Sequence, residues 1–299
     1  MGSAEAAGAR RRLKLLCESD RLLGMKEWPV GKRSRSVDGV SSTRGSGEED
    51  LAPAVRERLE ALMVALPPEL EPPGADPKNR PDPIYSAGHA LKGSPVEVVK
   101  AKAAALARQA EEVKQCKRCG LYQTCRQKVF GIGHPDTRLV FVGEAPGADE
   151  DRLGYPFVGR AGHLLTAMVE KGMGLRREHV YICNVLKCRP PENRTPTTDE
   201  MAACQDHMWA QLSVIEPEVV VALGLPAMQT LLNTTDPIGR RRGQFYEIHL
   251  SGSDLMGGPV AKCLPTYHPA YLLRNPADKK KAWEDLKKVM AAMGIKAGG

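Results

Sequence analysis

Four of the eight cysteines have a spacing that is typical of metal binding. Cys116 and Cys119 form a C-x2-C pair, and Cys188 and Cys204 form a much wider C-x15-C pair. The first residues lack the apolar core of a signal peptide, so we expect a cytoplasmic protein whose reduced thiols hold a metal rather than disulfides. The second pair is too wide for a zinc knuckle, in which each half is a tight pair. An iron–sulfur cluster accepts cysteines from distant parts of a chain, and the spacing therefore favours a cluster over zinc.

Three further positions carry side chains or backbone groups that suit a small-molecule site. The segment 143–147 reads Gly-Glu-Ala-Pro-Gly and directly follows an apolar run, so it forms a sharp turn that presents backbone N–H groups and the carboxylate of Glu144. It lacks the Gly-Lys-Ser/Thr ending of a phosphate-binding Walker A loop. Phe157 lies in a loop rich in Gly and Pro, where it either covers the core or meets a ligand. Asn184 ends the next strand and offers both an amide donor and a carbonyl acceptor, although it also suits a simple turn.

A fourth candidate segment follows the last expected strand. His268 stands at the strand end, where a lone histidine is more often structural than catalytic. Its neighbours are unusual, because a rigid Pro269 and a loop of apolar residues precede Arg274. Apolar residues ahead of an arginine suit a wedge that enters a DNA groove while the cation meets a phosphate.

The elements that position these residues alternate along the chain. We expect strands at 139–142, 179–185, 219–223, 245–250 and 262–267, and helices at 95–114, 161–171, 198–215, 226–232 and 278–293. This alternation predicts an α/β fold with three layers, in which helices cover both faces of a central, short and mainly parallel sheet. Function in such sheets gathers in the loops at the carboxyl ends of the strands, which is where the candidate residues fall.

The rest of the chain is organised as extensions to this domain. Residues 1–50 are poor in aromatics and rich in Arg, Ser and Gly, so we expect a disordered basic and polar tail. Residues 51–94 combine a short helical pattern with a Pro-rich linker. The net charge of +7 suits a polyanionic partner, and no apolar run approaches the roughly 18 residues of a membrane span.

Four motifs occur in a fixed order within residues 110–290, namely 143–147 (Gly-Glu-Ala-Pro-Gly), 156–162 (Pro-Phe-Val-Gly-Arg-Ala-Gly), 184–191 (Asn-Val-Leu-Lys-Cys-Arg-Pro-Pro) and 268–274 (His-Pro-Ala-Tyr-Leu-Leu-Arg). Together they resemble the family 4 uracil-DNA glycosylases, which are bacterial and archaeal repair enzymes with a [4Fe-4S] cluster. The resemblance implies a catalytic domain over residues 95–299 that acts as a monomer on DNA containing uracil. Such an enzyme hydrolyses the N-glycosidic bond of a flipped nucleotide and leaves an abasic site.

The resemblance also implies roles for individual residues. Phe157 stacks on the flipped uracil, the Asn184 amide pairs with its N3 and O4, and His268 reaches its O2. The turn after the first strand lines the pocket with Gly143, Ala145 and Gly147, and it contributes Glu144 as the catalytic carboxylate. The residues that fill the gap in the DNA or hold its backbone are Tyr271, Leu272, Leu273 and Arg274, with the basic runs 240–242 and 279–281 as further phosphate contacts. The implied cluster ligands are Cys116, Cys119, Cys188 and Cys204, and the cluster is expected to be structural.

Two points stay open in the sequence. Family 1 enzymes have an aspartate at the position of Ala145, so the group that activates water is Glu144 or no carboxylate at all. Cys125 and Cys183 do not match ligand positions, yet Cys125 is close enough to Cys119 in the chain to replace one ligand.

Two other functions are alternatives to glycosylase activity. A relative that traps uracil DNA covalently carries a Lys-Arg-Arg-Ile-His run, whereas residues 195–198 here read Thr-Pro-Thr-Thr after Arg194. An iron–sulfur protein that transfers electrons or binds DNA without catalysis needs none of Phe157, Asn184 and His268. Both alternatives are therefore less favoured than a uracil-DNA glycosylase.

Overall fold

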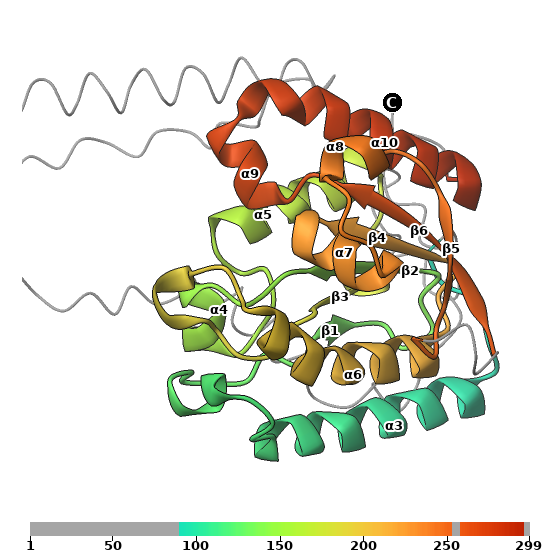
Figure 1. The fold of residues 1–299 in the computed structure, drawn as a ribbon. Coiled ribbons are helices and arrows are strands. Elements are labelled where there is room, and N and C mark those ends of the chain that lie inside the picture. The colour runs from blue at the N-terminus through green and yellow to red at the C-terminus, as the bar shows by residue number, and fades with distance from the viewer. Residues whose placement is uncertain (1–89, 253–257, 296–299) are drawn as a thin grey trace, which may run out of the picture. The chain divides into compact units, whose positions relative to one another are not determined.

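The computed structural model describes residues 90–252 and 258–295, which fold around a six-stranded sheet (Figure 1). The expected tail over residues 1–50 lies outside the described residues, as does the expected linker up to residue 89. The strands are β1 (Ile132–Gly133), β2 (Leu139–Gly143), β3 (Tyr181–Asn184), β4 (Val219–Leu223), β5 (Tyr246–His249) and β6 (Val260–Thr266). Their order across the sheet is β1-β3-β2-β4-β6-β5.

The four central strands run parallel, and the two edge strands are antiparallel to their neighbours. The carboxyl ends of β2, β3, β4 and β6 therefore meet at one edge of the sheet. Gly143 at the end of β2 pairs with Asn184 at the end of β3, so the sheet itself brings the first candidate loop beside the candidate asparagine. All residues of β2 and β4 are buried, as expected for parallel strands that are covered on both faces.

Helices cover both faces of the sheet and make the three layers that the sequence predicts. One face packs against α3 (Val96–Gln115), α6 (Thr198–Ile215) and α7 (Leu225–Leu232), and the other against α5 (Arg160–Ala167), α9 (Pro269–Arg274) and α10 (Lys279–Met293). Figure 1 shows α3 and α6 below the sheet, and α9 and α10 above it. Two shorter helices, α4 (Ala148–Leu153) and α8 (Ile238–Arg241), lie in the connections.

The core is divided by the two-residue period of the strands. Leu139 and Phe141 of β2 pack in the cluster that includes α5 and α10, whereas Val140 and Val142 pack in the cluster that includes α3 and α6. Successive side chains of a strand point to opposite faces, so one apolar run supplies both cores. The predicted α/β architecture with a mainly parallel sheet is confirmed.

The start of α6 is fixed by a capping box. The Thr197 hydroxyl accepts a hydrogen bond from the Glu200 N–H at 3.2 Å, and the Glu200 carboxylate accepts one from the Thr197 N–H at 2.9 Å. Arg194 donates to the same carboxylate. Because the first turn of α6 is anchored in this way, the position of Cys204 in its second turn is set as well.

Several predicted boundaries agree with the structure, and others differ. α6 and β4 begin and end where the sequence predicts, at 198–215 and 219–223. The helix expected over 161–171 is α5 followed by a π-helical turn at Met168–Gly172. The expected loop over 269–274 is wrong, because these six residues form α9 with His268 as its N-cap and Pro269 in its first turn. A helix this short shows less than two turns of periodicity, so the proline dominates the sequence signal.

Among the described helices, none combines the length and the apolar character that a membrane crossing requires.

Candidate active site

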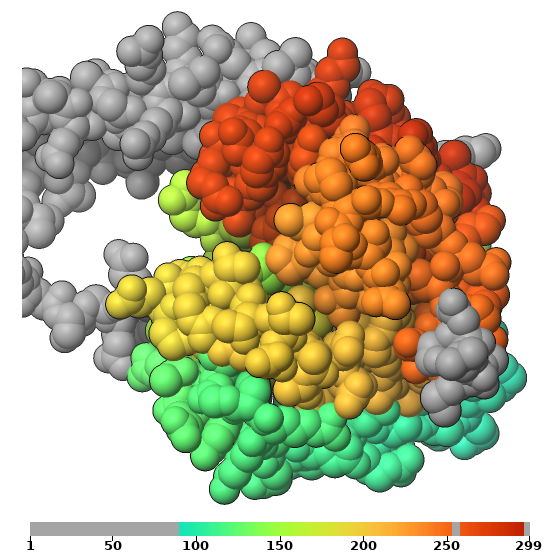
Figure 2. Space-filling model, in the orientation of Figure 1, coloured from blue at the N-terminus to red at the C-terminus, as the bar shows by residue number. Residues whose placement is uncertain are grey.

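Three predicted pocket residues converge at the end of β2. A Cβ atom placed on Gly143 would lie 2.3 Å from Asn184 Oδ1 and 2.7 Å from Phe157 Cζ, so any larger side chain at this position would clash with both. The glycine is therefore required by the close approach of the asparagine amide and the aromatic ring. Figure 2 shows the surface hollowed between the red segment that includes α9 and the yellow segment that follows β3.

The backbone of Phe157 is held in an uncommon conformation. Its φ angle is +53°, in the left-handed region that bulky residues rarely adopt. Gly162 makes room for this turn, because a Cβ there would lie 1.9 Å from the Phe157 carbonyl oxygen. Arg177 donates hydrogen bonds to the carbonyl oxygens of Pro156 at 2.9 Å and of Phe157 at 3.1 Å. Its guanidinium also donates to Thr166 Oγ1 at 2.8 Å, and so the loop is fixed to α5.

Asn184 carries an unused acceptor into the same pocket. The residue is only 2% exposed, and its Oδ1 has no hydrogen-bond partner among the residues that the structure describes. A buried polar atom without a partner costs free energy, so most such atoms in native proteins are paired. Here the unpaired acceptor lies beside the Phe157 ring. A planar ligand with an N–H donor could stack on the ring and donate to this acceptor.

His268 completes the group from the end of β6. Its ring centroid lies 5.5 Å from that of Phe157. The Nδ1 atom accepts a hydrogen bond from the Ala270 N–H at 3.1 Å, which leaves Nε2 to carry the proton of the neutral ring. Burial, with a further contribution from the Arg274 charge, lowers the pKa of His268 to about 4. The side chain is therefore a neutral imidazole with one N–H donor in place.

The turn after β2 is tied to the Phe157 loop by Glu150. This carboxylate accepts hydrogen bonds from the N–H groups of Gly147 at 3.1 Å, Val158 at 2.9 Å and Gly159 at 3.0 Å. The Gly147 N–H is thus engaged within the protein and does not face a ligand. Pro146 has no N–H, whereas the Ala145 N–H makes no hydrogen bond within the described parts of the chain.

Glu144 lies half-buried in the same turn. Burial raises the pKa of its carboxyl group. Its side chain makes no hydrogen bond or ion pair with the residues whose structure is described. A carboxylate in such a position retains its capacity to accept a proton or to orient water.

The four residues expected to contact DNA separate into two groups on α9. Leu272 is 1% exposed and belongs to the core that α5 and α10 share, so its expected role as a wedge conflicts with its burial. Tyr271 stacks on Tyr267 with ring centroids 4.9 Å apart, and its hydroxyl donates to Asp278 at 2.6 Å. Leu273 is half-exposed and Arg274 is exposed, so these two remain able to meet DNA.

The two basic runs are partly engaged within the protein. Arg241 pairs with Asp236, and Arg242 pairs with Asp285 at 2.7 Å. Lys279 is buried, and Lys281 pairs with Asp278 at 2.8 Å. The exposed cations in these runs are Arg240, Lys280 and Lys281.

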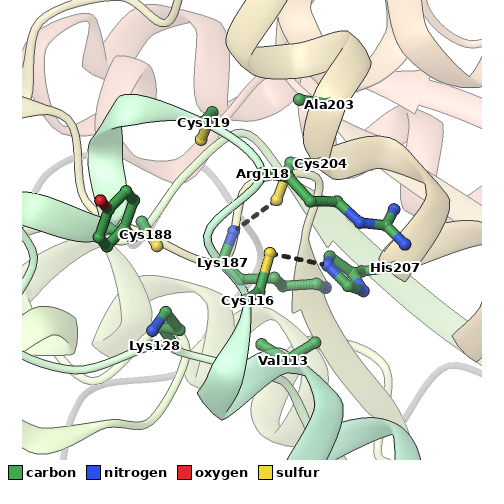
Figure 3. A pocket seen from close by; sticks show the side chains of 11 residues that line it. Val113, Cys116, Arg118, Cys119, Lys128, Lys187, Cys188, Ala203, Cys204 and His207 are labelled. Atoms are coloured by element: carbon green, nitrogen blue, oxygen red, sulfur yellow. Dashed lines mark hydrogen bonds between the residues drawn. The ribbon is translucent and has the colours of Figure 1, made fainter.

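The four predicted ligand cysteines gather at one hollow, which lies between the end of α3, the segment after β3 and the start of α6 (Figure 3). Its lining includes Cys116, Cys119, Cys188 and Cys204. The Lys187 N–H donates to Cys204 Sγ at 3.3 Å, and His207 Nε2 lies within hydrogen-bond distance of Cys116 Sγ, at 3.3 Å. N–H groups directed at cysteine sulfurs are the usual surroundings of a metal-bound thiolate.

The donor set consists of four cysteines, which are the ligands that an iron–sulfur cluster uses. No three His, Cys, Asp or Glu side chains of the described residues are close enough to hold one ion. A four-iron cluster places each thiolate on its own iron, so its ligands surround a cage rather than a point. Burial raises the pKa of the thiols of Cys188 and Cys204, and a bound metal offsets this effect by stabilising the thiolates.

Cys125 is a further cysteine that lies close to the predicted ligands. Cys125 is a hydrogen-bond neighbour of Cys188, and this neighbour adds to the effect of burial in raising the pKa of Cys188. Its Sγ also lies 3.9 Å from the Tyr122 carbonyl oxygen. Cys125 is not among the residues that line the hollow, whereas Cys183 is buried in the core of the sheet.

Three residues at this site are not predicted by the sequence motifs. Glu150 stands three residues after Gly147 and accepts from its N–H, but glycine has no side chain to complete a capping box, so the sequence pattern is only half present. Lys187 lies inside the motif at 184–191, but nothing in the sequence indicates that it is buried. Arg177 lies outside all four motifs, and only the folded chain brings it to the Phe157 carbonyl.

Comparison with known proteins places this site in a family. The profile of the uracil DNA glycosylase superfamily matches residues 130–287, which is more than half of the chain. The chain therefore belongs to the uracil-DNA glycosylase superfamily. It is 46% identical over 180 residues to the type-4 uracil-DNA glycosylase of Thermotoga maritima, covering 60% of this chain and 89% of that relative.

Other relatives show where in the superfamily the chain belongs. The type-4 uracil-DNA glycosylase of Archaeoglobus fulgidus is 44% identical over 189 residues, with 62% of this chain and 92% of that protein covered. The type-5 uracil-DNA glycosylase of Thermus thermophilus is 35% identical over 154 residues, with 47% and 68% covered. The chain is thus a type-4 member of the superfamily, as the four motifs and the cysteine spacing predict.

Proposed function

We propose that this protein is a DNA repair glycosylase that flips uracil out of DNA and hydrolyses its N-glycosidic bond. The observation that carries this proposal is the convergence of Phe157, the unpaired Asn184 Oδ1 and the His268 ring beside Gly143. This pocket contains an aromatic platform, an acceptor and a fixed N–H donor. Those are the groups that a flipped uracil requires, since the base is planar and has an N3–H donor between two carbonyl acceptors.

Base recognition is assigned to Phe157 and Asn184. A base inside a duplex is out of reach of a buried pocket, so the nucleotide must leave the stack at a cost of a few kcal/mol. Stacking on an aromatic ring returns about 1–3 kcal/mol. The Asn184 Oδ1 accepts from uracil N3–H while the amide NH2 donates to O4. Cytosine reverses both polarities and would leave buried polar groups unpaired, so it is rejected.

Bond cleavage is assigned to His268 and the turn after β2. As the bond to the sugar breaks, negative charge develops on uracil O2 and positive charge on the sugar. The Nε2–H of neutral His268 donates to O2, and its hydrogen bond from Ala270 fixes the ring for this task. One preorganised donor of this kind typically changes kcat about 100- to 1,000-fold. The unpaired Ala145 N–H is a second candidate donor.

Glu144 is assigned to the water that attacks the sugar. The carboxylate has no partner among the described side chains, so it is available to accept a proton from water or to offset charge on the sugar. Leu273 is assigned to the gap that the flipped nucleotide leaves, and Arg274 to the DNA backbone. The proposed substrate is DNA containing uracil, the proposed oligomeric state is a monomer, and the proposed location is the cytoplasm at the nucleoid.

The four cysteines at the hollow are the proposed ligands of a [4Fe-4S] cluster. When bound, the cluster links the end of α3, the segment after β3 and α6 through iron–thiolate bonds, and its role is structural. The chain itself supplies the Lys187 N–H that donates to Cys204 Sγ and the His207 ring nitrogen that lies beside Cys116 Sγ.

The proposed activity is tested with a labelled duplex that contains a single uracil. Incubation followed by alkali should cut the strand at that site, because an abasic sugar is labile to alkali, and should leave matched thymine and cytosine duplexes intact. Free uracil should appear in equal amount. A preparation that contains iron and cuts none of the duplexes, next to an active control enzyme, would overturn the proposal. Binding of the uracil duplex without uracil release would favour a non-catalytic or covalently trapping protein instead.

A further inference from the structure

Lys187 is a fully buried cation between the base pocket and the cysteine hollow. It stands three residues after Asn184 and directly before Cys188, and its side chain is only 1% exposed. Lysine is among the residues least often buried, since transfer of its charge out of water costs several kcal/mol unless the group is paired. A lysine in this position therefore needs a specific set of partners.

The side chain of Lys187 holds the main chain of the base-reading residue. Its Nζ donates to the Asn184 carbonyl oxygen at 2.7 Å and to Gln211 Oε1 at 2.5 Å, and it lies 5.9 Å from the centroid of the Phe130 ring. Gln211 is fixed in turn, because its amide donates to the Tyr181 hydroxyl at 2.8 Å. The ammonium group thus links the end of β3 to α6 through two hydrogen bonds.

The backbone of Lys187 holds the cysteine side of the same segment. Its N–H donates to Cys204 Sγ at 3.3 Å, as Figure 3 shows, and its carbonyl oxygen accepts from the Val129 N–H at 2.7 Å. One residue therefore contacts Asn184 through its side chain and a predicted cluster ligand through its main chain.

The charge of Lys187 lacks a carboxylate counter-ion within the described part of the chain, since its partners there are a carbonyl, an amide and an aromatic face. Four thiolates around a [4Fe-4S] cluster carry a net negative charge. Because the main-chain N–H of Lys187 contacts Cys204, the ammonium group of the same residue is buried within one side-chain length of that charge.

We propose that Lys187 is a positioning residue that couples the cluster site to base recognition. Its ammonium group orients the Asn184 main chain and offsets the negative charge of the cluster, while its N–H holds Cys204. The inference rests on the proposed uracil-DNA glycosylase function. It goes further in assigning one residue outside the catalytic machinery to both sites.

The test compares Lys187→Met with Lys128→Met in the full chain. Methionine keeps an unbranched side chain that is one atom shorter than lysine, and it removes the charge and the donors. Lys128 also lines the cysteine hollow, but its Nζ donates to the Lys114 carbonyl and has no contact with Asn184, so it is a matched control. Iron content, the rate at which a chelator bleaches the visible absorption, kcat/KM for uracil and inhibition by free uracil are measured for each protein.

Lys187→Met is expected to lose iron to the chelator several-fold faster than Lys128→Met. It should also show about a tenfold lower kcat/KM and weaker inhibition by free uracil, which corresponds to the loss of a hydrogen bond from a charged donor. If Lys187→Met yields no iron-containing protein, Lys187→Arg serves as the second variant, and recovery of iron with arginine supports the role of the charge.

Two results would overturn the proposal. One is a Lys187→Met protein that matches Lys128→Met in iron loss and in uracil binding. The other is loss of iron in both the Met and the Arg variants. Iron retention would then depend on the shape of the lysine side chain and not on its charge. A wild-type protein that retains iron but releases no uracil would instead refute the proposed function.

Discussion

At the scale of single residues, contacts within the protein determine which pocket atoms can donate a hydrogen bond and which can accept one. The Ala270 N–H forces the proton of His268 onto Nε2, and burial keeps the ring neutral. The Asn184 Oδ1 is left without a partner in an otherwise buried site. Both groups incur their desolvation cost before substrate arrives, which is the preorganisation that electrostatic catalysis requires.

The pH dependence of the reaction separates Glu144 from His268. Burial raises the pKa of Glu144 above its ordinary 4.5, so activity that needs its carboxylate falls as the pH drops through that raised pKa. The pKa of His268 is about 4, so the ring stays neutral near pH 6.5 and adds no loss of activity there. We expect kcat/KM on the uracil duplex to show an acid limb above pH 4.5 and no step from histidine between pH 6 and 7.

The Glu144→Gln protein provides the control for this profile. It should be slower than wild type at neutral pH and should lack the acid limb. An acid limb that persists unchanged in Glu144→Gln would show that another group titrates.

Arg177 is expected to matter for catalysis although it does not touch the substrate. Arg177→Met removes two hydrogen bonds to the Phe157 loop, so the ring loses its fixed orientation. We predict about a tenfold loss in kcat/KM and weaker inhibition by free uracil, with unchanged affinity for abasic DNA. The neighbouring Arg176 pairs with Glu178 and has no contact with the loop, so Arg176→Met should stay within about twofold of wild type. Equal losses in the two variants would contradict this role.

At the scale of elements, α9 has one side in the core and one side outside it. Leu272 fills the core, and so Leu272→Ala should lower the free energy of unfolding by about 2–5 kcal/mol in a denaturant titration. Leu273 is half-exposed, and Leu273→Ala should leave stability nearly unchanged. Its kcat/KM should fall more on duplex than on single-stranded DNA, since only a duplex leaves a gap to fill. Equal effects on the two substrates would remove Leu273 from that role.

The sequence predicts some elements well because one signal dominates them. β4 is a run of apolar residues that is buried on both faces, and α6 starts at a capping box, so both boundaries agree with the structure. The sequence predicts a loop at 269–274 where the structure has α9, because six residues led by a proline give no clear period.

The candidate site was predictable only as far as its motifs reached. The pairing of Gly143 with Asn184 follows from two parallel strands with aligned ends, and that much is readable from the sequence. The φ angle of +53° at Phe157 is set by Gly162 and Arg177, which are distant contacts that no local pattern encodes. The burial of Lys187 likewise depends on Gln211, which lies on a different element.

At the scale of the whole molecule, the cysteine hollow is lined by three segments that are distant in the sequence, namely the end of α3, the segment after β3 and the start of α6. Cys188→Ser should therefore remove most of the iron, the visible absorption and much of the thermal stability. A loaded wild-type protein should contain about four irons per chain. Cys125→Ser should keep its iron, because Cys125 does not line the hollow. Loss of iron in Cys125→Ser with retention in Cys188→Ser would reassign the fourth ligand.

The central claim for the whole molecule is that the fold assembles one pocket whose Asn184 amide distinguishes uracil from cytosine. The most direct measurement is kcat/KM on duplexes that differ only in a single uracil or cytosine, for wild type and for Asn184→Asp. The account predicts that wild type releases uracil alone, and that Asn184→Asp loses uracil activity while its preference for uracil over cytosine falls by at least about tenfold. Unchanged selectivity in Asn184→Asp, with activity retained, would show that Asn184 does not recognise the base and would contradict the account.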